Sequence, residues 1–174
     1  MLKSNKPLQV KTTLKAKAKL QANKKPKKQT KPTITKVKKD AIIWFNRAVK
    51  YRDSDYIEQE WLFVCITCPR RVLFRDRDGQ FYKTAHAGHF MPCHKENTRF
   101  NELNVNGQCA SCNYNQGEQY QYAKALELKY GDGTADELTK LSKVRKQWTV
   151  PELEEIIKEY RSQCEWYEKQ AQTR

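Results

Sequence analysis

Acidic residues are absent from the first 39 residues of the chain, although this segment contains 14 lysines. It also has no aromatic residue and few large apolar ones. Such a segment cannot bury enough surface to offset its conformational entropy, so we expect a disordered arm over residues 1–39. Residues 40–174 hold 20 basic and 20 acidic residues, so the net charge of +14 lies in the arm.

A lysine-dense arm is typical of polyanion binding, because lysines neutralise phosphates and release counterions. We therefore predict nucleic-acid contact for the arm, with Lys24, Lys25, Lys27 and Lys28 as its densest cluster. The alternatives are a solubility tail or a targeting peptide. The arm lacks the arginine and serine bias of an organelle peptide and the apolar core of a secretory signal.

Long apolar runs are also missing, and none approaches the ~18 residues of a membrane span. The sequence therefore predicts a cytoplasmic protein without a membrane partner. In a reducing compartment, cysteines are more often metal ligands or free thiols than disulfides. The spacing of the six cysteines is therefore informative.

Histidine is scarce, and the three histidines all fall within AHAGHFMPCH, residues 85–94. They are His86, His89 and His94, with Cys93 beside the last one. Histidine is the side chain best suited to proton transfer or metal binding near neutral pH. This stretch is therefore the first place to look for a functional site.

The pattern of the folded part predicts an α+β class. A helix is expected over residues 41–53, since Ile42, Phe45 and Val49 recur at helical spacing. Residues 54–60 read as a linker and residues 61–65 as a short strand. A hairpin is expected between residues 71–74 and 80–86, with its turn at residues 76–79, followed by a polar loop over residues 93–107.

Helices dominate the second half of the chain. One is expected over residues 118–130, with Gly131 as its C-cap. Two more have capping-box starts, Thr134 with Glu137 and Thr149 with Glu152. In the last helix Cys164 lies in the apolar stripe, which indicates packing. We thus divide the chain into an arm (1–39), a helix and linker (40–60), a core (61–130) and a helical region (131–174).

Two CxxC units provide a metal site for this small core. They are Cys65 with Cys68 and Cys109 with Cys112, separated by 40 residues. Four thiolates are the tetrahedral set that a structural zinc prefers, and a closed shell leaves no position for catalysis. A redox CxxC is the alternative, and Cys93 or His94 could replace a ligand although neither belongs to a CxxC unit.

If both CxxC units bind one zinc, the residues between them form a closed loop that contains the histidine cluster. Asn113 directly follows the last ligand and would lie near the start of a helix, while His89 would end a strand. A histidine and an asparagine beside a basic segment form a candidate site for a divalent cation and a scissile phosphate.

The stretch AGHF…NELNVNGQCASCN resembles the HNH nuclease signature, also called the ββα-metal motif. The motif residues correspond to His89, Asn104 and Asn113, and the form closed by asparagine is similar to phage endonuclease VII. WFNRAVKYRD, CITC, AGHF, TRFNELNVNGQCASCN, GEQY, KYGDGTADEL and ELEEIIKEY together resemble the NinG (Rap) family of phage recombination proteins. This resemblance covers roughly residues 40–165, without the basic arm.

The resemblance implies a structure-specific DNA endonuclease acting on recombination intermediates such as Holliday junctions and D-loops, in the host cytoplasm if a phage encodes it. His89 would be the general base. Asn113 would ligate a catalytic Mg²⁺ or Mn²⁺ through its side-chain oxygen. The amide of Asn104 would bond backbone to hold the loop that positions His89.

One position departs from the HNH pattern. Many HNH enzymes carry Asp or His directly before the base as a second metal ligand, and here that position is Gly88. In order of preference, the metal is held by Asn113 with phosphate and water, or His86 reaches in from the same strand face, or His89 is itself a ligand. An ordinary surface histidine is the alternative for His86.

Basic side chains are concentrated between the CxxC units and suit phosphate contacts that position DNA. The predicted contact residues there are Arg70, Arg71, Arg75, Lys83 and Arg99. A solvated charged hairpin is the alternative explanation.

Three functions compete: a nuclease of branched DNA, a non-catalytic zinc module that binds DNA or a partner, and an HNH nuclease of linear duplex. Gly88 favours the second function, and the His89, Asn104 and Asn113 spacing favours the first. No separate sequence-reading domain is visible, which counts against the third. Symmetric cleavage of a junction needs two active sites, so a homodimer is expected, and recombination proteins are the expected partners.

Overall fold

In the computed structural model, residues 32–114 and 118–173 are described. Residues from Thr33 onward form one compact unit. Lys24, Lys25, Lys27 and Lys28 lie outside the described residues, so the predictions for them stay predictions.

The first described helix, α2, runs from Ile34 to Arg52 and begins before the boundary that we predicted at residue 40. Its buried face starts at Val37 and continues through Ala41 and Phe45 to Val49. Val37 is one turn before Ala41, so the apolar stripe extends into the lysine-rich segment. Ile43, although apolar and next to Ile42, is exposed.

A three-stranded antiparallel sheet follows, with strands in the order β1 (Ser54–Ile57), β2 (Glu60–Val64) and β3 (Arg71–Arg75). The predicted linker over residues 54–60 is wrong, because it contains β1 and the turn into β2. Glu58 and Gln59 form that turn with positive φ angles. Two such residues are typical of a type I′ hairpin turn, but glycine and asparagine usually occupy its positions, so no local pattern marks this turn.

The predicted hairpin between residues 71–74 and 80–86 forms only next to its turn. Arg75 makes an isolated antiparallel bridge with Phe81, and the Tyr82 N–H donates to the Phe74 carbonyl. As a strand, β3 pairs with β2. The turn itself forms at residues 76–79, with Gly79 at φ +81°. The second predicted strand instead contributes to β4 (Ala85–His89), which pairs antiparallel with β5 (Val105–Cys109).

Strand β5 begins within the segment 93–107 that we predicted to be polar loop, and it is buried along its whole length. The Asn-Gly pair at residues 106–107 is typical of a turn. Here Gly107 is required by packing, because an added Cβ would lie 2.7 Å from the ring of Phe63 on β2. The two sheets therefore meet where Phe63 covers Gly107.

In the described part of the chain, four helices follow β5: α3 (Ala110–Tyr114), α4 (Gln119–Tyr130), α5 (Thr134–Ser142) and α6 (Val150–Gln172). Gly131 is the C-cap of α4, and Thr149 with Glu152 forms the capping box of α6, as predicted. The other predicted box is wrong, because α5 is capped by Gly133 and Thr134 donates its hydroxyl to the Gly131 carbonyl.

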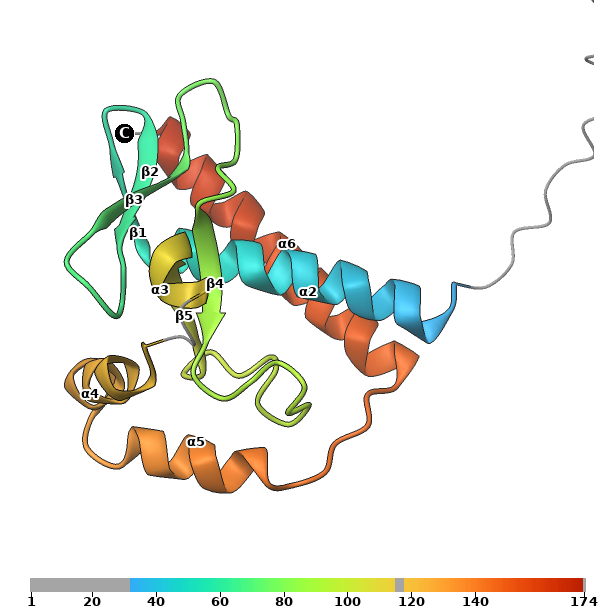
Figure 1. Cartoon of the computed structure of the whole chain (residues 1–174). Coiled ribbons are helices and arrows are strands. Elements are labelled where there is room, and N and C mark those ends of the chain that lie inside the picture. Colours follow the sequence, from blue (N-terminus) through green and yellow to red (C-terminus); the bar gives the residue numbers. More distant parts are fainter. Residues whose placement is uncertain (1–31, 115–117, 174) are drawn as a thin grey trace, which may run out of the picture. The chain divides into compact units, whose positions relative to one another are not determined.

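Helices α2 and α6 pack along each other and against the strands (Figure 1). The main core combines Phe45 of α2 with Phe63 and Phe74 of the first sheet, Val105 of β5, and Tyr160 of α6. Cys164 is buried in the same core, as its position in the stripe indicated. The mixture of helices and two small antiparallel sheets confirms the α+β class. Among the described helices, none has the length and apolar character needed to cross a bilayer.

Candidate functional site: a four-cysteine cluster beside a histidine–asparagine pair

The four cysteines of the two CxxC units come together in space. Cys65 and Cys68 lie in the connection between β2 and β3, Cys109 ends β5, and Cys112 lies in α3. Their four sulfur atoms all lie within 4.8 Å of one another. The cluster therefore joins the first sheet to the β4–β5 hairpin and could hold a metal ion, with a donor set that fits structural zinc.

The protonation of these thiols depends strongly on their surroundings. Burial favours the thiol form of Cys65, but the Cys109 backbone N–H and Thr67 outweigh it and lower the pKa of Cys65 to about 7. Thr67 also favours the thiolate of Cys112, yet burial and the neighbouring thiols raise the pKa of Cys112 to about 12. Four thiolates this close repel one another, so the fully deprotonated set needs a cation.

Neither Cys93 nor His94 belongs to this cluster. Both side chains are exposed, in the loop between β4 and β5. The substitution of either one as a ligand, left open by the sequence, has no support in the geometry of the described residues.

His86 and Asn113 are brought together by the turn from β5 into α3. Cys109 pairs with Ala85 across the hairpin, and α3 then places Asn113 over β4. The Asn113 amide nitrogen lies 3.4 Å from Nδ1 of His86. The other ring nitrogen, Nε2, is buried without a hydrogen-bond partner among the described residues.

The charge state of His86 follows from its position. Burial and the nearby Lys50 ammonium both lower the pKa of His86, and both therefore favour the neutral imidazole that can bind a metal. Lys50 lies in the last turn of α2 and donates to the carbonyl oxygen of Ala85. We did not anticipate Lys50, since a single lysine in an amphipathic helix gives no functional signal.

His89 is the last residue of β4, as predicted, but it belongs to the opposite strand face from His86. Its pKa is lowered mainly by burial, with the charge of Arg99 acting in the same direction and hydrogen bonds to backbone opposing. Within the described ranges, no hydrogen bond or ring contact joins His89 to His86 or Asn113. His89 is therefore not in contact with the pair formed by His86 and Asn113.

Asn104 is fully buried and bonds backbone on both sides of the loop between β4 and β5. Its side-chain oxygen accepts from the Met91 N–H at 2.6 Å, and its amide donates to the carbonyls of Met91 and Thr98. Its backbone carbonyl accepts from the N–H of Phe90. These bonds fix the chain directly after His89.

Gly88 lacks a side chain for a steric reason. A Cβ at this position would lie 2.1 Å from Oε1 and 2.9 Å from Cβ of Gln108, the residue opposite His86 on β5. The Gln108 amide donates to the hydroxyl of Thr67, beside the cysteine cluster. The space that a ligand at position 88 would need is therefore already filled by Gln108.

The predicted DNA-contact residues differ in their availability. Arg70, Arg71 and Lys83 are exposed. Arg75 is tied to the interior instead, because it donates to the Tyr51 hydroxyl and pairs with Glu168 at 3.0 Å. Arg99 lies beside Glu96, with 3.6 Å between Nε and Oε2.

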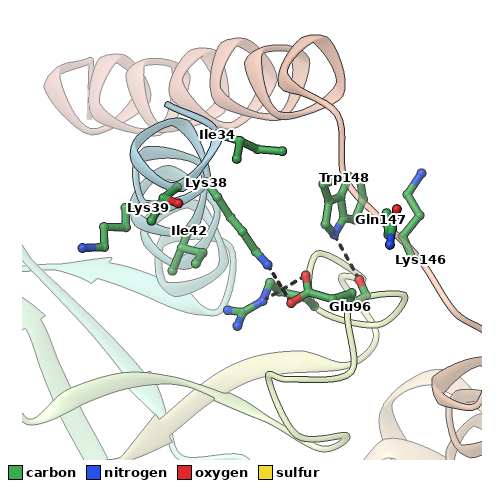
Figure 2. A pocket seen from close by; sticks show the side chains of 10 residues that line it. Ile34, Lys38, Lys39, Ile42, Glu96, Lys146, Gln147 and Trp148 are labelled. Carbon is green, nitrogen blue, oxygen red and sulfur yellow. Dashed lines mark hydrogen bonds and ion pairs between the residues drawn. The ribbon is translucent and has the colours of Figure 1, made fainter. Parts of the chain in front are cut away.

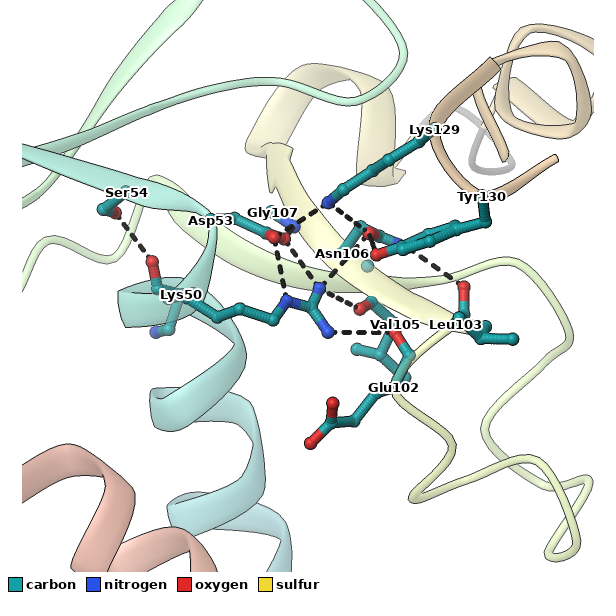
Figure 3. Close-up of polar contacts among 12 residues, drawn as sticks. Lys50, Asp53, Ser54, Glu102, Leu103, Val105, Asn106, Gly107, Lys129 and Tyr130 are labelled. Carbon is teal, nitrogen blue, oxygen red and sulfur yellow. Dashed lines mark hydrogen bonds and ion pairs between the residues drawn. The ribbon is translucent and has the colours of Figure 1, made fainter. Parts of the chain in front are cut away.

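A polar network between α2, β5 and α4 supports the hairpin and was not anticipated from the sequence (Figure 3). Arg52 donates to the carbonyl of Val105 and to Asp53, and Asp53 accepts from the Gly107 N–H at 2.7 Å. Lys129 and the Tyr130 hydroxyl both donate to the Asn106 side-chain oxygen. The network fixes strand β5, which ends at Cys109.

Comparison with known proteins identifies one family. The sequence model described as Bacteriophage Lambda NinG protein matches residues 2–170. This match is wider than the motif resemblance, since it includes most of the lysine-rich arm. No curated protein and no solved structure matches the chain.

Proposed function

The chain belongs to the NinG family of phage recombination-associated proteins, and from this premise we propose that it is a metal-dependent endonuclease of branched recombination intermediates. Holliday junctions and D-loops are the substrates that the family resemblance implies. The enzyme would hydrolyse a backbone phosphodiester and would act as a homodimer, with one active site for each cut.

The observation that carries the proposal is the contact between Asn113 and His86 beside the four-cysteine cluster. It occurs where two antiparallel strands are followed by a helix, the order of a ββα-metal motif. His89 ends the first strand, Asn104 fixes the loop, and Asn113 lies in the helix. This order supports the HNH-like reading of the motif residues.

In this proposal His89 accepts a proton from the attacking water. The lowered pKa keeps its imidazole neutral at pH 7, the form that a general base requires. Asn104 is a positioning residue, because its hydrogen bonds hold the backbone directly after His89. Arg70, Arg71 and Lys83 would hold DNA through phosphate contacts.

Asn113 and His86 would hold the catalytic cation. Asn113 offers a carbonyl oxygen, the ligand type that Mg²⁺ and Mn²⁺ prefer, and His86 offers a neutral ring nitrogen. A bound cation would supply Lewis-acid stabilisation of the phosphate and the leaving oxygen. The contact of His86 with Asn113 makes it the best substitute for the ligand that Gly88 lacks. The zinc at the four cysteines would be structural.

The direct test is a nicking assay on four-way junctions, D-loops and linear duplex, with Mg²⁺, Mn²⁺ or EDTA. His89→Ala should reduce cleavage by at least about 100-fold, since a general base contributes that much. His94→Ala removes an exposed histidine of the following loop and is the matched control. Equal activity of the wild type and His89→Ala on every substrate would exclude the nuclease.

His86→Ala distinguishes the two ways of holding the cation. If His86 is a ligand, the variant should need a higher Mn²⁺ concentration for half-maximal cleavage, and excess Mn²⁺ should restore part of the rate. If the concentration dependence is unchanged, Asn113 holds the cation with phosphate and water alone.

A non-catalytic zinc module that binds DNA is the second candidate. The observations that favour it are the Gln108 side chain over Gly88 and the position of His89 on the other strand face. This candidate predicts junction binding without cleavage under any metal condition. Cleavage confined to linear duplex would instead favour the third candidate, an HNH nuclease of ordinary DNA.

A further inference from the structure

A pocket of about 610 Å³ lies away from the histidine–asparagine site, between α2, the loop after β4 and the segment that leads into α6 (Figure 2). Ile34 and Ile42 of α2 form one wall, and Trp148 lies across from them. The volume is in the range of pockets that enclose small organic ligands. An aromatic ring therefore faces an apolar wall across an open space.

The lining of the pocket carries a net positive charge. Four basic side chains line the pocket, namely Lys38, Lys39, Arg99 and Lys146. Glu96 is the single acidic residue of the lining. The Lys38 ammonium bonds Glu96 at 2.6 Å, which neutralises that carboxylate. Lys146 pairs with Glu152 outside the pocket, and Lys39 is exposed. The remaining positive charge suits an anionic ligand.

Trp148 is held in place by three contacts of its side chain. Its indole N–H donates to the Glu96 carbonyl at 3.3 Å, and its ring makes a T-shaped contact with Phe100 at 5.1 Å between centroids. The Lys146 ammonium lies over the ring, 4.6 Å from its centroid. An indole fixed beside basic side chains is a combination that proteins use to stack a base and hold its phosphates.

Arg99 and Glu96 both line the pocket, and Nε of Arg99 forms an ion pair with Oε2 of Glu96 at 3.6 Å. Both atoms are buried, so this pair belongs to the wall of the pocket and is not a contact for a ligand. The groups left for a ligand are the Trp148 ring and the basic side chains of the lining.

We propose that this pocket binds one unpaired nucleotide of the DNA substrate, with its base beside Trp148 and its phosphates near Lys39 and Lys146. The inference rests on the proposed function only in taking DNA as the ligand, and cleavage is not needed for it. In duplex DNA the face of each base is covered by its neighbours, so only an unpaired base can stack on a protein ring.

The pocket shares the loop between β4 and β5 with the proposed base. The Arg99 side chain lines the pocket, while its backbone lies near His89. DNA bound at His89 could therefore also reach this pocket through an unpaired segment. Branched intermediates contain unpaired or easily unpaired nucleotides, and a pocket of this kind would favour them over intact duplex.

The experiment measures binding by fluorescence anisotropy in EDTA, with the full chain, so that nuclease activity plays no part. The probes are an oligo-dT, an oligonucleotide of the same length made of abasic sites, and a duplex. Trp148→Leu should weaken oligo-dT binding about tenfold, the amount expected for one stacked base. It should leave abasic and duplex binding unchanged, and Trp148→Phe should retain most of the affinity.

Trp166→Leu is the matched control, because Trp166 is an exposed tryptophan on α6 outside the pocket. Melting curves of all three variants establish that each is folded. If Trp148→Leu weakens the three probes equally, or no more than Trp166→Leu does, the nucleotide pocket is excluded. A chain that binds oligo-dT through Trp148 but never cleaves would refute the nuclease and leave this inference standing.

The phosphate contacts have a separate readout. For oligo-dT binding by Lys39→Gln, the plot of log affinity against log salt should be less steep by about 0.7, since one phosphate contact is lost. Lys36→Gln removes one charge from the same helix outside the pocket lining and should leave the slope unchanged. Equal slopes for both variants would exclude Lys39 as a phosphate contact.

Discussion

The four-cysteine cluster and the histidine–asparagine site both use α3, yet their side chains are brought together differently. The four sulfur atoms lie within 4.8 Å of one another. In the second site, Asn113 reaches His86, while His89 belongs to the other face of β4. The four cysteines are thus already together in the folded chain. The proposed catalytic residues are not, because His89 and His86 lie on opposite faces of β4.

The difference indicates what each site needs. A structural metal site must be assembled by the fold itself, because it contributes directly to folding. A catalytic site that acts on DNA can be completed by the substrate, since phosphate oxygens and water provide the missing ligands. We expect the first site to dominate stability and the second to dominate activity.

The largest expected effect is on the cysteine cluster. Cys109→Ser should abolish stoichiometric zinc binding and lower the free energy of unfolding by about 4 kcal/mol or more, because the site joins the two sheets. Zinc analysis and thermal melting measure this. Cys93→Ser, an exposed cysteine outside the cluster, is the control and should change neither quantity. A folded Cys109→Ser chain with undiminished zinc would contradict the cluster.

Asn104→Ala, in the proposed catalytic site, should cause the next largest loss of stability. It removes three hydrogen bonds and leaves the N–H and the carbonyl of Met91 without the partner that Asn104 provides. We expect a loss of about 3 kcal/mol in urea unfolding. Asn97→Ala removes one bond, to the Leu141 carbonyl, and should cost only about 1 kcal/mol. Equal losses would mean that Asn104 has no special role in the loop.

Gly88→Ala tests whether the Gln108 side chain fills the space beside position 88. Its Cβ would overlap Gln108, so we expect a destabilisation of about 2 kcal/mol, measured by urea unfolding. In a chain that already carries Gln108→Ala, adding Gly88→Ala should cost less than it does in the wild type, because the overlapping side chain is gone. If Gly88→Ala is as stable as the wild type, position 88 is open and the explanation for its glycine is wrong.

The smallest effect concerns the network that holds β5, which serves both sites. Burial alone would raise the pKa of Asp53, but the hydrogen bond and charge of Arg52, together with Lys129, lower it below the ordinary value. A carboxyl with a depressed folded-state pKa stabilises the fold above its unfolded-state pKa near ~3.9, and this contribution is lost as the pH falls further.

Asp53→Asn should therefore destabilise the protein by about 1–2 kcal/mol at pH 7 and by less at pH 3. Urea unfolding of the wild type and the variant at both pH values gives the comparison. A difference that stays constant between the two pH values would show that the carboxylate charge of Asp53 is not what the network uses.

Local patterns were sufficient for part of this structure. The Thr149 capping box, the Gly131 C-cap and the burial of Cys164 each depend on a few neighbouring residues, and all three predictions are confirmed. Strand pairing was not predictable in the same way. Asp76 to Gly79 forms the expected turn, yet β3 pairs with β2, because pairing depends on which apolar faces meet in the core.

The sequence by itself determined the four cysteines, since a CxxC unit places two sulfur atoms together through local geometry alone. It also indicated His89, Asn104 and Asn113 through their spacing. Only the tertiary structure decided that Asn113 meets His86, that Gln108 fills the space at Gly88, and that Trp148 faces α2 across a cationic pocket. These contacts join residues far apart in the chain, and they depend on strand register and helix packing, which no short sequence pattern specifies.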